Sequence, residues 1–147
     1  MALTFKIFSD AALTTEQVGN LVATQNSDGS TPPVEFQLWI GSLGSAGGDT
    51  PDRKVQADSD PGTDTIDLVP TDLDPGNGHE VAEIKIATTQ GGLAGATPGA
   101  LLALAATLTS GTGNAVEFWV SVDDATNTVG TSVELSVDTV LLRETDV

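Results

Sequence analysis

The chain has 147 residues, no cysteine, and 21 acidic against 5 basic side chains, which gives a formal net charge of −16. Without cysteine, a disulfide framework and a thiolate zinc site are excluded. Nucleic acids and anionic membranes attract Lys and Arg, so we expect neither as a partner of so acidic a chain. The length fits one domain over residues 1–147, and the 39% hydrophobic content argues against disorder.

Apolar and polar residues alternate in short stretches along the first half of the chain, which is the pattern of half-buried strands. The first stretch contains Leu3, Phe5 and Ile7 and ends at Asp10. Gly, Pro, Asn and Asp separate the stretches and indicate turns. The segments predicted in this way are strands at 21–23, 34–40, 54–57 (an edge strand) and 65–69, with turns at 26–33 and 58–61 and a glycine-rich loop at 41–51.

The second half of the chain continues the same pattern. A turn at 70–78 leads to a strand at 80–88, where Ala82, Ile84 and Ile86 share one face. Further on, two alternating stretches flank an Asp- and Thr-rich turn, which is the arrangement of a hairpin. These stretches are 115–122 and 132–142, and the turn is 123–128.

The segment 97–108 fits two structures. Thr97 is a good N-cap, Pro98 suits the first helical position, and the following Ala and Leu residues favour a helix. The segment also alternates, with Leu102, Leu104 and Leu108 on one strand face. Strands are predicted on both sides, so we interpret it as a strand and keep a short helix as the alternative.

One strand pattern occurs twice. Residues 34–40 (VEFQLWI) and 116–122 (VEFWVSV) both place apolar residues at every second position. Their recurrence far apart in the chain suggests two core strands of one sandwich or jelly roll. We therefore predict an all-β fold, an antiparallel β-sandwich or jelly roll with a single domain.

The inventory of reactive residues gives little basis for an enzyme. His79 is the single histidine, so it cannot build a multi-histidine metal site, and no nucleophile elbow or phosphate loop occurs. We interpret His79 as a polar turn residue. We predict no enzymatic activity and no catalytic or cofactor-binding residue.

The repeated strands carry the remaining candidates for carbohydrate chemistry. Glu35 and Glu117 hold equivalent positions near Trp39 and Trp119. Paired carboxylates about 5 or about 6.5–9.5 Å apart perform glycoside hydrolysis. The simpler interpretation is that both carboxylates face water. A weaker hypothesis is a glycan-binding face on which the two tryptophans stack against sugar rings, and the structural alternative is that both pack beneath a neighbouring subunit or loop.

Two turns are rich in aspartate. Asp58, Asp60 and Asp64 lie in the first, and Asp72 and Asp74 lie in the second. This spacing resembles the front of a calcium loop, but no bidentate Glu closes either loop in the EF-hand pattern. Asp-Pro-Gly is also good turn chemistry. We therefore predict turns and no metal site, with structural calcium as the alternative.

The N-terminal residues do not resemble a targeting segment. Lys6 and Asp10 interrupt any apolar run, so we expect no secretory signal peptide. No stretch approaches the roughly 20 apolar residues that span a bilayer. We expect synthesis in a host cytoplasm, although the Thr, Gly, Val and Asp content is typical of extracellular β modules. A virion protein would reconcile these two observations.

Four segments resemble tailed-phage virion structural proteins. They are residues 6–15 (KIFSDAALTT), which are similar to the opening of phage accessory domains, and residues 79–93 (HEVAEIKIATTQGGL), 96–101 (ATPGAL) and 110–120 (SGTGNAVEFWV). The resemblance implies a β-sandwich module displayed on a capsid or tail, often oligomeric and without catalysis. It implies no particular binding residue.

From this resemblance we expect a non-enzymatic virion structural protein, a capsid decoration (cement) protein that docks on the head and stabilises it. Its partner would be a phage capsid protein, and it would form a homotrimer, since capsids offer threefold sites. Leu3, Phe5, Trp39 and Trp119 are the candidate interaction residues, together with the loop 41–51. The alternatives are a tail or tail-fibre module, which would bind a tail protein, and a glycan-binding β-sandwich module.

Overall fold

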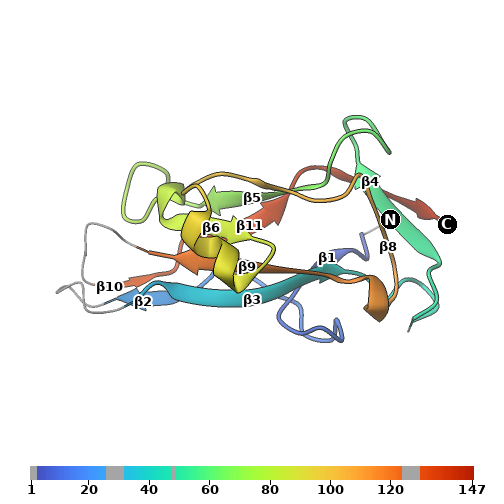
Figure 1. Cartoon of the computed structure of the whole chain (residues 1–147), viewed down its shortest axis with the longest axis horizontal. Coiled ribbons are helices and arrows are strands. Elements are labelled where there is room, and N and C mark those ends of the chain that lie inside the picture. The colour runs from blue at the N-terminus through green and yellow to red at the C-terminus, as the bar shows by residue number, and fades with distance from the viewer. Residues whose placement is uncertain (1–2, 26–31, 48, 124–129) are drawn as a thin grey trace.

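The computed structural model describes residues 3–25, 32–47, 49–123 and 130–147, whose regular secondary structure is mostly antiparallel strands (Figure 1). Three short 3-10 helices interrupt them: η1 (Val81–Glu83), η2 (Gln90–Gly95) and η3 (Thr112–Asn114). The strands are β1 (Lys6–Phe8), β2 (Ala23–Gln25), β3 (Val34–Gly41), β4 (Arg53–Ala57), β5 (Asp67–Asp72), β6 (Ile84–Ala87), β7 (Leu102–Ala103), β8 (Thr107–Thr109), β9 (Val116–Val122), β10 (Gly130–Ser132), β11 (Leu135–Thr139) and β12 (Leu142–Asp146).

The first layer is a four-stranded sheet in the order β1-β3-β9-β6. Its centre is the pair β3 and β9, the two strands that repeat one another in sequence. They run antiparallel with Val34 opposite Val122 and Ile40 opposite Val116. This register places the apolar residues of both strands on the same side, where they face the second layer. Leu38 and Phe118, which are 2% and 0% exposed, meet at the middle of this inner face.

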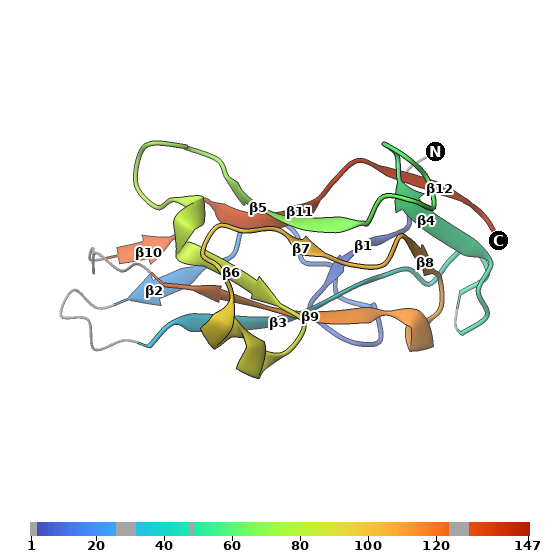
Figure 2. The same ribbon diagram turned by 45° about the horizontal axis from the view of Figure 1, so that its top comes forward.

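The second layer contains two three-stranded ladders, β11-β5-β7 and β12-β4-β8, which lie end to end (Figure 2). The same three chain segments build both ladders. Backbone hydrogen bonds join them where the strands bend: Val140 N–H donates to the Asp67 carbonyl at 3.1 Å, and Asp58 N–H donates to the Leu141 carbonyl at 2.9 Å. The two ladders are therefore halves of one bent sheet, interrupted by the 58–66 turn. The short strand pair β10-β2 forms a separate two-stranded sheet at one end of the molecule (Figure 1).

One hydrophobic core fills the space between the layers. Both layers contribute, and the buried members come from segments at opposite ends of the chain. The all-β antiparallel prediction is confirmed, and one layered core explains why the strands alternate. The core residues are Phe5, Leu21, Ala23, Leu38, Ile40, Val55, Ile66, Leu68, Ile84, Ile86, Leu108, Phe118, Val120, Val122, Leu135 and Val137.

Several predicted strands shift or change partner. The hairpin between 115–122 and 132–142 is wrong, because β9 pairs with β3 and β6 while β10, β11 and β12 pair with β2, β5 and β4. Residues 124–128 of its turn, and 26–31 of the earlier turn, lie outside the described residues. The predicted edge strand 54–57 is β4, which lies between β12 and β8. Leu21 is buried, but the strand predicted at 21–23 runs from Ala23.

Three further segments settle differently from their sequence pattern. The sequence predicts a turn that begins at Pro70, yet β5 continues through this residue to Asp72. This position tolerates proline because β7 pairs only with Asp67 and Leu68, so β5 is an edge beyond them. The strand predicted at 80–88 begins instead with the η1 turn. The segment 97–108 forms the two short strands β7 and β8 rather than a helix, as predicted.

No helix among the described residues is long and apolar enough to cross a membrane.

Candidate functional site

The outward face of the β3–β9 pair carries the side chains that sequence analysis singled out. The register puts Trp39 opposite Glu117, Gln37 opposite Trp119 and Glu35 opposite Ser121. Trp39 and Trp119 are therefore diagonal neighbours on one face, where both remain partly exposed. We call the set Glu35, Gln37, Trp39, Glu117 and Trp119 the tryptophan face.

Hydrogen bonds fix the polar groups of the tryptophan face. Glu117 Oε1 accepts from Gln37 Nε2 at 2.7 Å and from the Trp119 indole Nε1 at 2.9 Å. Glu35 Oε2 accepts from Gln90 Nε2 of η2 at 2.5 Å. These bonds orient the Trp119 ring and leave its apolar surface as the part that a partner can contact.

Two segments flank the tryptophan face. At one end, Phe8 of β1 pairs with Trp39 and is covered by the loop that follows, whose Leu13 is 2% exposed. At the other end, η2 packs against β6 and β9. Figure 1 shows η2 crossing in front of these strands. The tryptophan face is thus open to solvent between two flanking segments, the loop after β1 and η2.

The geometry does not bring Glu35 and Glu117 together as a catalytic pair. Glu35 lies opposite Ser121, four residues along β9 from Glu117. At a rise of about 3.4 Å per residue, their backbone rows are about 14 Å apart, beyond the roughly 5–9.5 Å between carboxyl groups in glycosidases. Each carboxylate also accepts from a different side chain.

The other two candidate interaction residues, Leu3 and Phe5, differ in their exposure to solvent. Phe5 is 3% exposed and belongs to the core, so the prediction that it contacts a partner is corrected: it lies two residues before Ile7 and shares the inward side of the chain with it. Leu3 is 38% exposed and lines shallow hollows beside β1. The conformation of the loop 41–51 is fixed by hydrogen bonds to the residue that follows it. Asp52 Oδ2 accepts from the backbone N–H groups of Ser45 and Ala46 at 2.9 and 2.8 Å.

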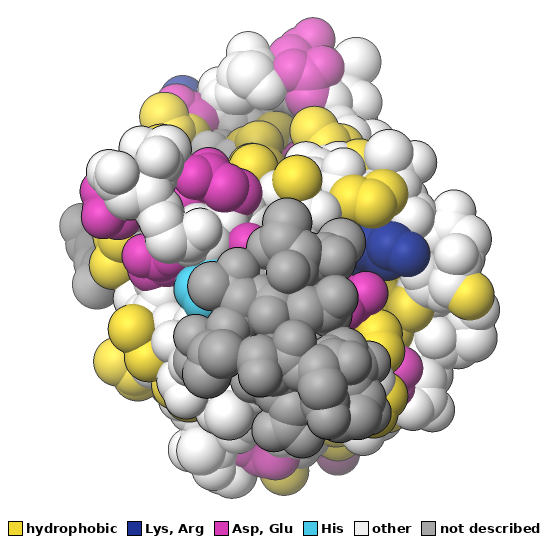
Figure 3. All heavy atoms as spheres, turned by 90° about the vertical axis from the view of Figure 1, so that its left-hand side faces the viewer, with side chains coloured by type: hydrophobic (Ala, Val, Ile, Leu, Met, Phe, Trp, Pro, Cys, Tyr) yellow, Lys and Arg dark blue, Asp and Glu magenta, His cyan; other side chains and the backbone are white. Residues whose placement is uncertain are grey.

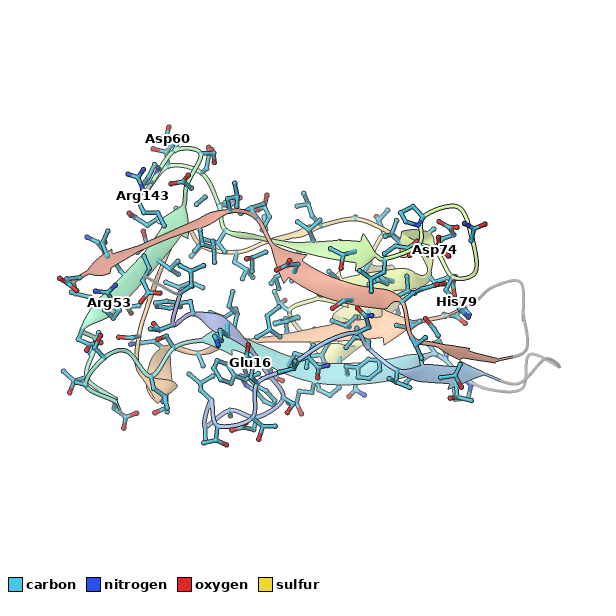
Figure 4. All side chains as sticks on the ribbon, turned by 180° about the vertical axis from the view of Figure 1, so that it is seen from behind. Glu16, Arg53, Asp60, Asp74, His79 and Arg143 are labelled. Carbon is cyan, nitrogen blue, oxygen red and sulfur yellow. The ribbon has the colours of Figure 1, made fainter. Side chains whose placement is uncertain are left out.

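The aspartate-rich turns lie at opposite ends of the molecule, as the positions of Asp60 and Asp74 show (Figure 4). Their carboxylates bond within the turns or to nearby side chains: Asp64 Oδ2 accepts from Ser59 at 2.6 Å, Asp58 pairs with Arg143 at 3.0 Å, and Asp72 Oδ1 accepts from the Asp74 backbone at 2.8 Å. Within the described ranges, no group of three His, Asp or Glu side chains is arranged to hold a metal ion. The prediction of turns is consistent with these bonds.

His79 also takes a structural position. Its Nδ1 lies 2.8 Å from Glu83 Oε1, one turn along η1, and its backbone N–H donates to Glu134. Glu83 in turn accepts from the Glu80 backbone at 2.7 Å. These contacts fix the start of η1 beside β11.

Sequence analysis missed a polar cluster built on Arg53 of β4. Its side chain is 10% exposed, and its Nε donates to Glu144 Oε1 at 3.0 Å, while a second nitrogen pairs with Asp146. The Thr4 backbone and hydroxyl both donate to Glu144 at 2.7 Å. The detectable signal was that Arg53, Val55 and Ala57 alternate onto one buried face, where an arginine requires a carboxylate partner.

The cluster shifts the ionisation of its members. Burial raises the pKa of Glu144, but hydrogen bonds from Thr4 and the charge of Arg53 outweigh it, so the pKa lies below its ordinary value of 4.5. The hydrogen bond that Arg53 donates to Glu144 raises the pKa of Arg53 and outweighs burial, which acts in the opposite direction. In the neighbouring residue Asp52, the hydrogen bond from the Ala46 backbone lowers the pKa below its ordinary value of 3.8, although burial acts to raise it. In the folded protein these groups are ionised at neutral pH.

Acidic side chains are spread over the molecule rather than gathered at the tryptophan face. In the view from the β2–β10 end, Asp and Glu side chains lie among hydrophobic ones in the part that is coloured (Figure 3). Comparison of the chain with protein-family models, curated proteins and solved structures gives no match.

Proposed function

We propose that the protein is a non-enzymatic virion structural protein of a tailed phage, a capsid decoration protein that docks on the head through the tryptophan face. The observation that carries the docking surface is the pair Trp39 and Trp119, partly exposed and diagonal on the open face of the four-stranded sheet. Large aromatic side chains at the centre of a contact contribute most of its binding energy. The phage assignment rests on the sequence resemblance.

The hydrogen bonds of the face support a docking role. Glu117 holds Trp119 and Gln37 in one arrangement before any partner arrives, so little side-chain freedom is lost on binding. Both tryptophans stand on the two central strands of one sheet, which is a rigid support. Their polar neighbours are bonded to one another, which lowers the cost of removing water from them.

A decoration protein acts through many copies. Each copy would bury the apolar surface of the two rings against the capsid, and modest energies per site would add up over the shell. A homotrimer would seat on a threefold position and present three such faces at once.

Co-sedimentation with purified capsids of the phage that encodes the chain tests this role. We expect the wild type to bind, and Trp119→Ala to weaken binding by roughly 30-fold, the effect of losing a contact worth about 2 kcal/mol. Leu141→Ala is the matched control, since Leu141 is 82% exposed and lies on the other layer. A wild type that ignores capsids, or a control that loses binding while Trp119→Ala retains it, would contradict the proposal. Binding to tails but not heads would select the tail or tail-fibre alternative.

The second candidate is a glycan-binding module on the same face. Trp119 lies beside an amide and a carboxylate, and a ring face next to hydrogen-bonding groups suits a sugar. Quenching of tryptophan fluorescence by oligosaccharides would support this candidate, and flat titrations across a broad panel would count against it. Hydrolysis of any bound glycan would be tested with Glu35→Gln and Glu117→Gln.

A further inference from the structure

A separate hollow of about 250 Å³ opens where η2 crosses the outward side of β6 and β9. The register places three of its lining residues in one row across three strands, with Glu35 opposite Ser121 and Ser121 opposite Lys85. From η2, Gln90 and Leu93 close the hollow on one side. Backbone pairing and one short helix therefore gather these groups from distant parts of the chain.

Ser121 lies at the middle of this row. The residue is 4% exposed, and its hydroxyl makes no hydrogen bond to any part of the chain that the structure describes. Because Ser121 lines the hollow, its hydroxyl can donate to or accept from a hydroxyl group that enters it.

The other lining groups define the chemistry of that guest. Lys85 supplies an ammonium donor, and none of the ion pairs among the described residues involves it. Glu35 supplies carboxylate oxygens, and Asp123 adds a second carboxylate at the rim. The two carboxylates oppose an anion and the ammonium opposes a cation, whereas a neutral hydroxyl can donate to one and accept from the other.

The volume and the lining of the hollow limit which neutral molecules it can bind. At about 250 Å³ the hollow is smaller than the 300–1,000 Å³ of drug-sized pockets, so it suits a single ring. Pro33, Leu93 and Ala94 add apolar surface to the lining, against which the carbon face of such a ring can pack.

We propose that this hollow binds one ring of a neutral saccharide, with Ser121, Lys85, Glu35 and Gln90 as its hydrogen-bonding residues. The site does not depend on the virion role and uses groups outside the docking pair Trp39 and Trp119. A saccharide chain that extends from the pocket would run along the tryptophan face toward Trp39.

The test is an NMR titration of the isolated, ¹⁵N-labelled protein with glucose, galactose, mannose and N-acetylglucosamine, and with glycerol as a polyol without a ring. We expect at least one sugar to shift the Trp119 indole signal and the Ser121 and Gly91 amides saturably, and glycerol to shift none of them. A panel in which no sugar gives saturable shifts up to about 50 mM, well above the millimolar Kd expected of a single ring, would overturn the proposal. Saturable shifts confined to other regions would overturn it as well.

Variants make the result specific to the hollow. Ser121→Val should weaken sugar binding by removing the hydroxyl from the middle of the row, whereas Ser136→Val, an outward position on β11, should leave it unchanged. Gln90→Ala changes an exposed helix residue that the core does not need, so it tests the site even if Ser121→Val is unstable. We expect Gln90→Ala to weaken binding by about tenfold. Unchanged affinity in a folded Gln90→Ala protein and in Ser121→Val would refute the site, and capsid binding would still be judged separately.

Discussion

At the residue scale, the Arg53 cluster forms a directed chain of hydrogen bonds. The Thr4 hydroxyl gives its proton to Glu144 at 2.7 Å, so Ser42 must donate to Thr4 across their 2.6 Å contact, and Ser42 itself accepts from the Gly44 backbone at 2.8 Å. Each bond polarises the next, which strengthens the series. Ser42 is fully buried, and this chain explains why a polar residue occupies that position.

A double-mutant cycle tests this chain. Ser42→Ala and Glu144→Gln should each lower the free energy of unfolding at pH 7 by about 2 kcal/mol, and the double variant should lose less than the sum because the same series is broken twice. Urea unfolding gives the four free energies. Full additivity would show that Ser42 and Glu144 act independently.

Acid should erase the effect of Glu144→Gln. The folded-state pKa of Glu144 lies below its ordinary value of 4.5, so its stabilising contribution is complete above that value and disappears as the pH falls through the folded pKa. Unfolding measured from pH 7 down to pH 3 should therefore show the wild type and the variant converging below about pH 4.5. Comparison with the variant removes the opposing effect of general charge neutralisation. A difference that stays constant over this range would contradict the assignment.

At the element scale, the sequence predicts strands better than it predicts their neighbours. Alternation identified 34–40 and 116–122 and placed Leu38 and Phe118 inward, because a buried face forces a period of two. It cannot say which strand lies beside which, since every half-buried strand presents the same pattern. That is why β9 was assigned to a hairpin with 132–142, although it pairs with β3 and β6.

The candidate site was foreseen only in part, for the same reason. The sequence indicated Trp39 and Trp119 as outward residues, but only the register between their strands makes them neighbours. The Ser121 hollow could not be foreseen, because it needs Lys85 and Gln90 to meet β9. Arg53 was overlooked because the predicted strand began one residue later, at 54.

Gly41 at the end of β3 tests how tightly the loop after β1, which flanks the tryptophan face, packs against the sheet. A Cβ there would lie 2.9 Å from Leu13 Cδ1 and 3.3 Å from Ala115, and Leu13 is buried with a left-handed backbone at φ 57°. Gly41→Ala should therefore destabilise the fold by about 1–3 kcal/mol. Gly91→Ala is the control, since its added methyl group meets nothing within 4 Å. Thermal unfolding that ranks the two variants equally would contradict this packing.

At the scale of the whole molecule, acidic charge exceeds what the basic residues can neutralise. Among the described residues, Lys6, Arg53 and Arg143 take part in ion pairs, while the formal net charge is −16. Such a charge keeps copies apart in solution unless a specific contact brings them together. Any oligomer must therefore bury apolar surface, and the exposed side chains of Val22, Leu73 and Val133 offer some.

The solution mass follows from the proposed trimer. Light scattering on a sizing column should give three times the monomer mass of 14.9 kDa, with no change on adding EDTA, because the aspartate turns are expected to act without metal. A monomer at every concentration would contradict the trimer. A shift on EDTA would instead assign a metal to the turns that contain Asp60 or Asp74.

The most direct test of the central claim is the copy number of the protein in purified virions, measured by quantitative mass spectrometry after heads and tails are separated. A decoration protein should be present in many copies per particle and should fractionate with heads. Absence from both fractions would contradict the virion assignment. Recovery with tails alone would contradict the capsid role.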